Sequence, residues 1–349
     1  MNGGHEKRII CFNETGSENN FLSGGVMKNE EKVTRRTFVK TVVGGAAALG
    51  IANTLEPFET FAQETNPKQK MPTRALGRTG HNVCLFSLGG QATLEQDGKT
   101  DEAVAIINRA IDLGVNYIDT AAAYGRGVSE TYIGEVMKTR RKEVFLATKT
   151  HDRSYDGSMR LLEKSLKQLQ TDRIDAWQLH NVRTQDDLDK IFAKDGAMKA
   201  MEKARDEKII RFLGITGHRD PFILKKGIEQ YPFDSILMAL NAADKHNASF
   251  IDHLLPTAVE KKMAIIGMKI PARGKIFREG GITSMKQAMG YVLTLPVSTV
   301  IIGISTLKDA EENVQLAKNF QPFSKEEMAH LELLTKPYYN EASWFKEKW

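Results

Sequence analysis

From about residue 72 onward, short apolar runs alternate with longer amphipathic segments. In one such segment Ala103, Ile106 and Ala110 recur at the spacing of one helix face. The apolar runs have the length and continuous hydrophobicity of buried strands. They lie at 83–88, 117–119, 144–148, 174–179, 209–215, 235–240, 264–268 and 298–302. Apolar strands that alternate with helices predict a parallel sheet covered by helices.

The number of repeats favours a single-domain (β/α)8 TIM barrel, which typically needs about 250 residues. The alternative is an open doubly wound sheet. In that fold a G-x-G-x-x-G turn follows the first strand, whereas this chain reads Ser87-Leu88-Gly89-Gly90 there. We expect the barrel to cover residues 72–335, preceded by a linker at 63–71. The aromatic-rich tail at 336–349 either caps the pocket or packs on the barrel exterior, and we expect the latter.

The N-terminal segment, residues 1–62, has the organisation of a cleavable export signal. Two adjacent arginines lie in Thr34-Arg35-Arg36-Thr37-Phe38-Val39-Lys40, and an apolar run at 42–52 follows. This run is much shorter than the roughly 20 residues of a spanning helix, so we expect no permanent membrane anchor. A small-x-small cleavage site ends at Ala62. Met27 opens a more typical signal than the polar residues before it, so we expect translation to start there.

The paired arginines, with Phe38 and Lys40 after them, resemble a twin-arginine export signal. Such a signal is an address read by a receptor. The resemblance implies that the twin-arginine machinery is a partner of the precursor and that the mature protein is periplasmic or otherwise extracytoplasmic. This machinery passes folded proteins, so a cofactor can be loaded before export and would then have to be held tightly.

Composition narrows the class of protein further. With 41% hydrophobic and 27% charged residues among 349, the chain is too apolar to be largely disordered. Its two cysteines, Cys11 and Cys84, exclude a disulfide scaffold and a cysteine-bound cluster. His246 and His253 have helical spacing but no evident third ligand, so we predict no metal site. The net charge of +5 is dispersed, which argues against a nucleic-acid partner.

Polar residues at the strand ends are the candidates for chemistry, because barrel enzymes place their sites there. Asp119 and Lys149 close the second and third strands, and His180 closes the fourth. Tyr124 lies five residues after Asp119. A phenol has a pKa near 10, and a neighbouring ammonium lowers that pKa. We therefore expect Lys149 to activate Tyr124.

Within this set we expect Asp119 to hold Lys149 charged and oriented. His180 is expected to donate a hydrogen bond to a substrate oxygen or to relay a proton. Such a set suits proton transfer to a developing alkoxide. This is the protein's share of carbonyl reduction, in which a nicotinamide carries the hydride.

Around these residues the sequence resembles the aldo-keto reductase family over about residues 72–320. The resemblance rests on Arg74-Ala75-Leu76-Gly77-Arg78-Thr79-Gly80, on Asn116-Tyr117-Ile118-Asp119-Thr120-Ala121-Ala122-Ala123-Tyr124-Gly125, on Leu146-Ala147-Thr148-Lys149 and on Gln178-Leu179-His180. All four positions of the family's catalytic tetrad match. The resemblance implies a barrel enzyme dependent on NADP(H) or NAD(H). Such an enzyme reduces an aldehyde, ketone or sugar carbonyl, or oxidises the matching alcohol, with Tyr124 as general acid/base.

The same resemblance implies cofactor-binding residues on the later strands. The expected set is Thr216 and Asn241 at the carboxamide, Met268 under the nicotinamide ring, Lys269 and Arg273 near phosphate or substrate, and Gly303, Ser305, Asp309, Glu312 and Asn313 at the adenosine phosphate. A helix N-terminus in this last segment would suit a phosphate. His151 and His218 either line the substrate pocket or lie at the surface.

Some of these positions depart from the family pattern. Members that prefer NADPH often carry Arg or Gln where this chain has Asp309, which would repel a 2′-phosphate, although Lys308 could offset that charge. Leu237 and Met268 stand where the family often has Gln and Tyr. Ser305 and Asp309 also suit a helix start without a binding role. The sequence therefore leaves the choice between NADP(H) and NAD(H) open.

Two alternatives accompany the reductase hypothesis. One is an exported barrel whose tightly bound nicotinamide performs internal redox chemistry or an isomerisation. The other is a ligand-binding barrel without turnover. The intact Asp119, Tyr124, Lys149 and His180 set favours an enzyme.

Overall fold

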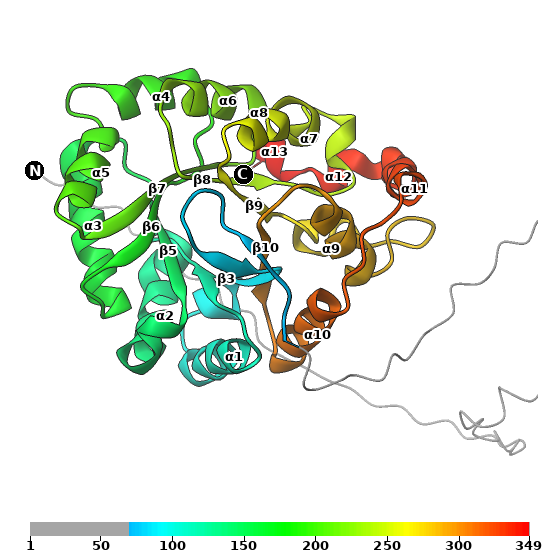
Figure 1. The fold of residues 1–349 in the computed structure, drawn as a ribbon, viewed down its shortest axis with the longest axis horizontal. Helices are drawn as coiled ribbons and strands as arrows, with labels where there is room; N and C mark the ends of the chain where they lie inside the picture. The colour runs from blue at the N-terminus through cyan, green and yellow to red at the C-terminus, as the bar shows by residue number, and fades with distance from the viewer. Residues whose placement is uncertain (1–69, 349) are drawn as a thin grey trace, which may run out of the picture. The chain divides into compact units, whose positions relative to one another are not determined.

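The structure, a computed structural model, describes residues 70–348. Within them, eight parallel strands close into a barrel in the order β10-β3-β4-β5-β6-β7-β8-β9. Figure 1 shows these strands at the centre with helices around them. The predicted (β/α)8 barrel is confirmed. The predicted signal, its cleavage site and most of the linker lie outside the described residues.

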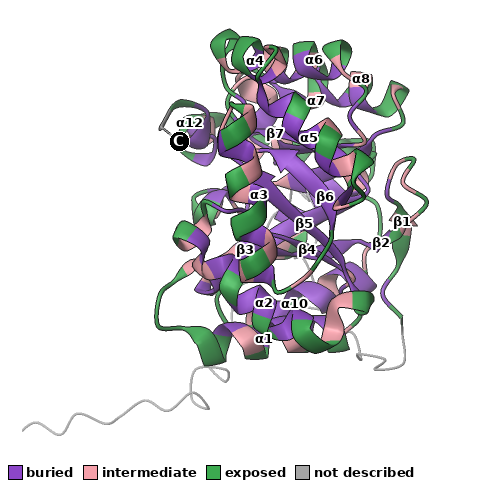
Figure 2. Cartoon of the chain, turned by 90° about the vertical axis from the view of Figure 1, so that its left-hand side faces the viewer, coloured by how far each residue is buried: buried purple, intermediate pink, exposed green. Residues whose placement is uncertain are grey.

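The barrel strands are short and almost completely buried. Their bounds are β3 (Phe86–Ala92), β4 (Tyr117–Asp119), β5 (Phe145–Thr150), β6 (Ile174–Leu179), β7 (Ile210–Gly217), β8 (Ser235–Ala239), β9 (Ala264–Met268) and β10 (Thr299–Ile304). Figure 2 shows the strands buried, while the helices around them are exposed on their outer faces. Burial on both faces explains why the strands read as continuous apolar runs rather than as alternating ones.

Helices follow the strands and cover the barrel. Their bounds are α1 (Thr100–Asp112), α2 (Val128–Arg140), α3 (Tyr155–Leu169), α4 (Gln185–Phe192), α5 (Ala197–Asp206), α6 (Pro221–Gln230), α7 (Phe250–His253), α8 (Leu255–Glu260), α9 (Met285–Thr294), α10 (Leu307–Lys318), α11 (Lys325–Thr335), α12 (Tyr339–Ala342) and α13 (Phe345–Lys348). The buried face of α1 includes Ala103, Ile106 and Ala110, as the periodicity predicts. In residues 70–348 no helix combines the length and apolar character needed to cross a membrane.

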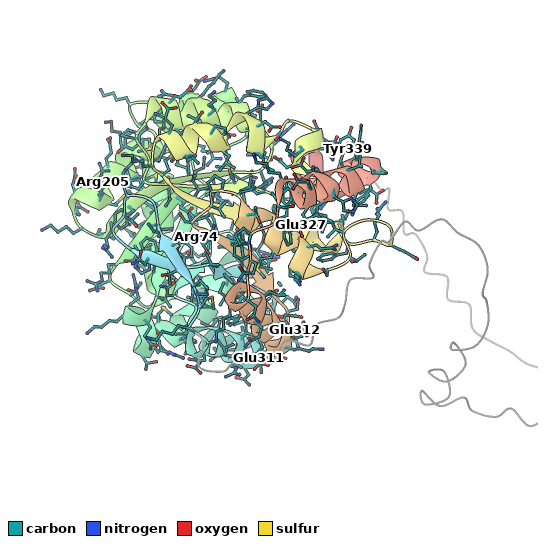
Figure 3. All side chains as sticks on the ribbon, turned by 45° about the vertical axis from the view of Figure 1, so that its right-hand side comes forward. Arg74, Arg205, Glu311, Glu312, Glu327 and Tyr339 are labelled. Carbon is teal, nitrogen blue, oxygen red and sulfur yellow. The ribbon has the colours of Figure 1, made fainter. Side chains whose placement is uncertain are left out.

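The first predicted strand, 83–88, is wrong as a single element. It is divided between β2 (Asn82–Cys84), which pairs antiparallel with β1 (Thr73–Ala75), and the barrel strand β3. Hydropathy does not separate the two because Val83 of the hairpin is also fully buried, against the residues that fill the barrel. Arg74, labelled in Figure 3, fixes the hairpin by donating 2.8 Å hydrogen bonds to two backbone carbonyls at the end of α9 and just after it.

The inside of the barrel is apolar at one end and polar at the other. Phe145 stacks between Tyr117 and Phe212, with ring centroids 5.3 and 5.9 Å apart. Because alternate residues of a strand face the same side, Tyr117 shares the inner face of β4 with Asp119. Phe145 likewise shares that of β5 with Lys149. The aromatic layer thus closes one end of the barrel and leaves the polar residues at the C-terminal strand ends.

The C-terminal residues pack against the loop between β9 and α9. The Tyr338 hydroxyl donates a 3.0 Å hydrogen bond to the carbonyl of Ile276 and accepts one of 3.0 Å from the amide of Ile282. Further along, the side chain of Phe345 is 1% exposed. This segment also reaches the functional end of the barrel, because the Phe345 carbonyl lies 3.3 Å from Nδ1 of His218.

Candidate active site

Lys149 is the centre of the polar cluster at the C-terminal end of the barrel. Its ammonium donates to Asp119 and to the carbonyl of Thr120, the latter at 2.7 Å. It also lies 3.2 Å from the hydroxyl of Tyr124. Lys149 is 1% exposed and Asp119 is fully buried, so the ion pair is shielded from water. The structure therefore brings these three predicted residues together.

Asp119 is held from two sides. Lys149 bonds one carboxylate oxygen, and Nε2 of Gln178 donates a 2.8 Å hydrogen bond to the other. Strand register creates this contact, because Gln178 of β6 is paired with Lys149 of β5. A carboxylate whose two oxygens both accept hydrogen bonds has a fixed orientation, so Asp119 can in turn fix the lysine.

The charges in this cluster are set by burial and by the ion pair. Burial raises the pKa of Asp119 above its ordinary value, against the opposing effect of Lys149 and Gln178. For Lys149, burial acts to lower the pKa, but Asp119 and Tyr124 outweigh burial and leave the pKa raised. Burial also raises the pKa of Tyr124 above that of an ordinary phenol, although Lys149 opposes it. Lys149 thus acts to lower the pKa of Tyr124, as predicted, but burial raises that pKa by more.

The backbone around Tyr124 is unusual. Gly125 and Arg126 both have positive φ angles, 55° and 57°. A side chain at Gly125 would place its Cβ 2.4 Å from the carbonyl oxygen of Glu95, so only glycine fits there. This close approach packs the tyrosine loop against the loop that follows β3.

His180 is in ring contact with Tyr124. The two rings meet edge to face, with centroids 5.6 Å apart. Burial and the positive charge of Lys149 lower the pKa of His180 well below its ordinary value. His180 is therefore a neutral imidazole at neutral pH and can donate one hydrogen bond without carrying a charge.

Three neighbouring cavities open at this end of the barrel. The catalytic cavity, about 240 Å³, is lined by Tyr124, Lys149 and His180. The central cavity, about 540 Å³, shares Tyr124 with it and extends to Gly303. The third, about 300 Å³ and here called the α10 cavity, continues from Gly303 toward Asp309. Together they form an elongated space that suits a dinucleotide, with Tyr124 where the central and catalytic cavities meet.

Most of the predicted cofactor residues line these cavities. The residues that do so are Thr216, Met268, Lys269, Arg273, Gly303, Ser305, Asp309, Glu312 and Asn313. Asn241 is not among the lining residues of the three cavities. Its side chain instead bonds the Ala243 amide at 2.9 Å and the Lys269 carbonyl at 3.2 Å. The structure therefore places Asn241 as a support for the loops around the site.

The predicted phosphate segment begins with a capping box at α10. The side chain of Thr306 accepts from the Asp309 amide at 3.1 Å, and the Asp309 carboxylate accepts from the Thr306 amide at 2.9 Å. Asp309 thus has the helix-start role while also lining the α10 cavity. Glu312 and Asn313 lie one turn further along the same wall, and Glu312 projects from α10 in Figure 3.

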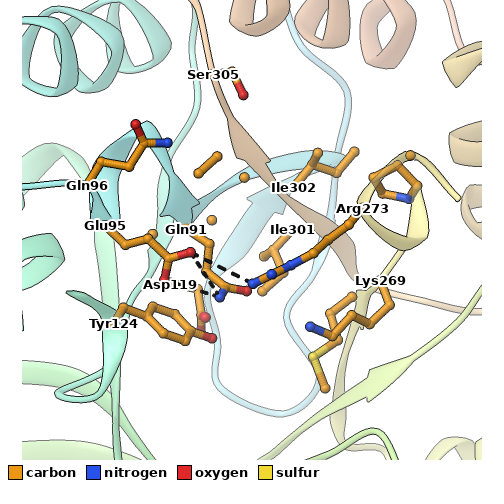
Figure 4. Close-up of a pocket in the computed structure, with 17 residues that line it drawn as sticks. Gln91, Glu95, Gln96, Asp119, Tyr124, Lys269, Arg273, Ile301, Ile302 and Ser305 are labelled. Carbon is orange, nitrogen blue, oxygen red and sulfur yellow. Dashed lines mark hydrogen bonds and ion pairs between the residues drawn. The ribbon is translucent and has the colours of Figure 1, made fainter. Parts of the chain in front are cut away.

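The wall opposite Tyr124 carries positive charge. Burial, Arg273 and Lys149 lower the pKa of Lys269 to about 7. Arg273 extends across the central cavity toward Glu95, as Figure 4 shows, and its Nη2 lies 3.9 Å from the Glu95 carboxylate. Nε2 of Gln91 also contacts that carboxylate, at 3.3 Å. The side chains of Glu95 and Arg273, from segments far apart in the sequence, thus meet across the central cavity.

The two histidines predicted near the pocket have different positions. His218 is 5% exposed and lines the catalytic cavity. Burial lowers its pKa to about 3. His151 is exposed and does not line any of the three cavities. The structure therefore brings His218, but not His151, to the tetrad.

Sequence reasoning missed the roles of Gln178, Gln91 and Glu95. Strand alternation could have revealed Gln178, because it lies two residues before His180 and so faces the same side. Nothing comparable marks Gln91 and Glu95. Gln91 is near the end of β3 and Glu95 lies in the turn after it, and only the closed barrel brings them opposite Arg273.

Known proteins are similar to this chain in sequence and in fold. The family model for the aldo/keto reductase family matches residues 86–274. The uncharacterized oxidoreductase YqkF of Bacillus subtilis is 28% identical over 312 residues, covering 76% of this chain and 97% of that protein. L-galactose dehydrogenase of Arabidopsis thaliana is 26% identical over 317 residues, covering 78% and 96%. The holo form of aldo-keto reductase AKR11C1 from Bacillus halodurans superposes with a TM-score of 0.65 at 26% identity, covering 76% and 96%.

The chain belongs to the aldo/keto reductase family. It is an NAD(P)-dependent oxidoreductase of the aldo-keto reductase type that acts on a carbonyl group or the matching alcohol.

Proposed function

We propose that Tyr124 is the general acid and base of this oxidoreductase. The observation that carries the proposal is the ammonium of Lys149, which contacts both the buried carboxylate of Asp119 and, at 3.2 Å, the hydroxyl of Tyr124. A phenol protonates a developing alkoxide efficiently only if its own anion is stabilised. Lys149 supplies that stabilisation, and Asp119 keeps the lysine charged and in place.

In the reduction, the hydride for the carbonyl carbon would come from a nicotinamide held beside Thr216 and Met268. The Tyr124 hydroxyl gives its proton to the carbonyl oxygen, which becomes the alcohol, and the phenolate that remains faces Lys149. The neutral imidazole of His180 orients the carbonyl oxygen by donating a hydrogen bond. In the reverse direction the phenolate removes the proton from the alcohol.

The Tyr124→Phe variant tests this assignment. Its fold and dinucleotide affinity should be unchanged, because the ring remains, while kcat for carbonyl reduction should fall about 100-fold or more. A ligand-binding barrel without turnover predicts no catalysed reduction in either protein. Equal kcat in wild type and variant would refute the role of Tyr124.

We also propose which residues hold the two ends of the dinucleotide. Thr216 and Met268 line the catalytic cavity and suit the nicotinamide. Gly303, Asp309 and Asn313 line the α10 cavity and suit the adenosine end. Asp309 and Glu312 place two carboxylates beside that end. Comparing the dissociation constants of NADPH and NADH, for the wild type and for Asp309→Asn, will show how these carboxylates act on the 2′-phosphate.

We further propose that the protein is exported by the twin-arginine pathway. The support is the sequence Thr34-Arg35-Arg36-Thr37-Phe38-Val39-Lys40 and the apolar run after it. In a bacterium with this pathway, mass spectrometry should find a periplasmic form that begins just after Ala62. Changing Arg35 and Arg36 together to lysine should leave the precursor in the cytoplasm. Export of that double variant would contradict the proposal.

A further inference from the structure

We propose that Arg153 is a positioning residue for His180, the histidine of the tetrad. Arg153 lies in the loop between β5 and α3, a short distance after Lys149. Its guanidinium crosses to the loop after β6, where it donates a 2.9 Å hydrogen bond to the backbone carbonyl of His180. One side chain thus joins the loop after the lysine strand to the residue that supplies the imidazole. The inference rests on the oxidoreductase function proposed above, in which His180 orients the substrate carbonyl.

The backbone of the barrel holds His180 on one side only. β6 ends at Leu179, and the amide of His180 still donates a 2.8 Å hydrogen bond to the carbonyl of Thr150 on β5. The next residue, Asn181, has a φ angle of +52°, so the chain leaves the strand direction directly after the histidine. Within residues 70–348, no backbone amide donates to the carbonyl of His180 or of Asn181. Both carbonyls therefore depend on a side-chain donor or on solvent.

Arg153 provides the donor that the backbone lacks. Its Nη2 donates to the carbonyl of His180 at 2.9 Å and to that of Asn181 at 3.1 Å. The guanidinium is itself held, because its Nε lies 2.9 Å from one carboxylate oxygen of Asp187. The other oxygen accepts from the amide of Thr184 at 3.1 Å, in the capping box that begins α4. The donors of a planar guanidinium have fixed relative positions, so the start of α4 determines where Nη2 lies.

The position of the His180 backbone matters because its ring lies at the reacting group. The ring meets that of Tyr124 edge to face, with centroids 5.6 Å apart, and it lines the catalytic cavity. A hydrogen bond to the substrate oxygen weakens steeply when its donor is misaligned. A displacement of about 1 Å in an active site can cost about 100-fold in rate. Arg153 lines none of the three cavities, so it acts on the reaction through His180.

Arg153 also acts on the charge of His180. Burial is the main cause of the lowered pKa of this histidine, and Lys149 is the next. His151, His218 and Arg153 have smaller effects in the same direction. A positive charge nearby disfavours an imidazolium, because like charges repel. Removing the charge of Arg153 should therefore raise the pKa of His180.

The Arg153→Gln variant removes the guanidinium, and Arg141→Gln is its matched control. Both arginine side chains are 15% exposed, and each pairs with a carboxylate, Asp187 for Arg153 and Asp175 for Arg141. Arg141 likewise donates to two backbone carbonyls, at 3.0 Å each. It lies before β5, at the end of the barrel away from the tetrad, so the control removes equivalent contacts from that end. A further variant, Arg153→Lys, retains the charge but not the planar fork of donors.

Three measurements separate positioning from stability. Urea denaturation gives the stability of each variant, initial rates with NADPH or NADH and the probe substrate glyceraldehyde give kcat and KM, and NMR of protein carrying 13C-labelled histidine gives the pKa of His180. In Arg153→Gln, kcat should fall about tenfold to 100-fold with a smaller change in KM, and the pKa of His180 should rise. In Arg153→Lys, kcat should fall while this pKa stays low. In Arg141→Gln, only stability should fall.

An equal loss of kcat in Arg153→Gln and Arg141→Gln would show that Arg153 has only a structural role, and would overturn the inference. An Arg153→Gln variant with the kcat and the His180 pKa of the wild type would overturn it as well. A wild type that binds neither NADPH nor NADH, measured by quenching of protein fluorescence, would instead overturn the proposed function. The NMR measurement needs no turnover, so the two failures are distinguishable.

Discussion

Nε2 of Gln178 donates a 2.8 Å hydrogen bond to the carboxylate oxygen of Asp119 that Lys149 leaves available. Both residues are fully buried, so this bond is shielded from competing water. Hydrogen bonds to buried charged groups are stronger than those between neutral groups. Gln178 therefore positions the tetrad without touching the reacting atoms.

We predict that Gln178→Met moves the acidic limb of the kcat–pH profile to higher pH. The hydrogen bond from Gln178 lowers the pKa of Asp119, so its loss raises that pKa. Asp119 then becomes protonated at a higher pH, and Lys149 loses its counter-ion there. Stability should fall by about 1.5–3 kcal/mol, measured by urea denaturation. A purely structural role would reduce stability and leave the pH profile in place.

Variants of Lys149 should show that its effect on the unfolding free energy and its effect on kcat can be changed independently. Lys149→Met leaves the buried carboxylate of Asp119 without its partner charge, which should cost about 3–5 kcal/mol of unfolding free energy. Adding Asp119→Asn removes that charge and should restore most of the stability. The double variant should remain inactive, because Tyr124 still lacks its cation. Recovery of kcat along with stability would show that Lys149 has only a structural role.

Dinucleotide binding should weaken as pH rises through about 7, the pKa to which Lys269 is lowered. Below that pKa the lysine is protonated and attracts the phosphates of the cofactor, and above it the lysine is neutral. Binding should therefore be accompanied by proton uptake near pH 7. Isothermal titration in buffers of different ionisation enthalpy measures this uptake. In Lys269→Gln both the uptake and this pH dependence should be absent.

The contact between Arg273 and Glu95 should slow cofactor release. Their side chains approach to 3.9 Å across the central cavity, and Arg273 is more than half exposed. Exposed ion pairs contribute about 0.2–1 kcal/mol, so Glu95→Gln should speed dinucleotide dissociation by at most about fivefold in stopped-flow experiments. The control is Glu311→Gln, which breaks the pair with Arg109 on the barrel exterior. Equal acceleration in both variants would argue against a role specific to the cavity.

The sequence predicts the barrel and the tetrad because both depend on local pattern. Lys149 and His180 lie directly at the ends of recognisable apolar strands, and strand ends of a parallel barrel converge. The split at residues 83–88 is not predictable from hydropathy, because Val83 is buried in the hairpin just as a barrel residue would be. The burial that raises the pKa of Tyr124 is likewise a property of the folded site.

Loop contacts are the least predictable part of the site. Glu95 meets Arg273 although the two residues are far apart along the chain and neither belongs to a strand. Asn241 shows the converse case. Its place after β8 suggested a ligand contact, whereas in the structure its side chain bonds two neighbouring backbone groups and lines none of the three cavities. The polar groups that remain available to a ligand can be identified only when the hydrogen-bond partners of every polar group in the folded site are known.

The pairing of β10 with β3 determines when the enzyme can acquire its cofactor. The tetrad comes from β4, β5 and the loops that follow β4 and β6, and is therefore made of residues from the first half of the barrel. The central cavity is different, because Gly89 and Gly90 form one wall and Ile301 to Gly303 form another. Folding that depends on contacts so distant in sequence is slow. Dinucleotide loading must therefore wait for the last strand, which makes cofactor binding a late step that follows closure of the barrel.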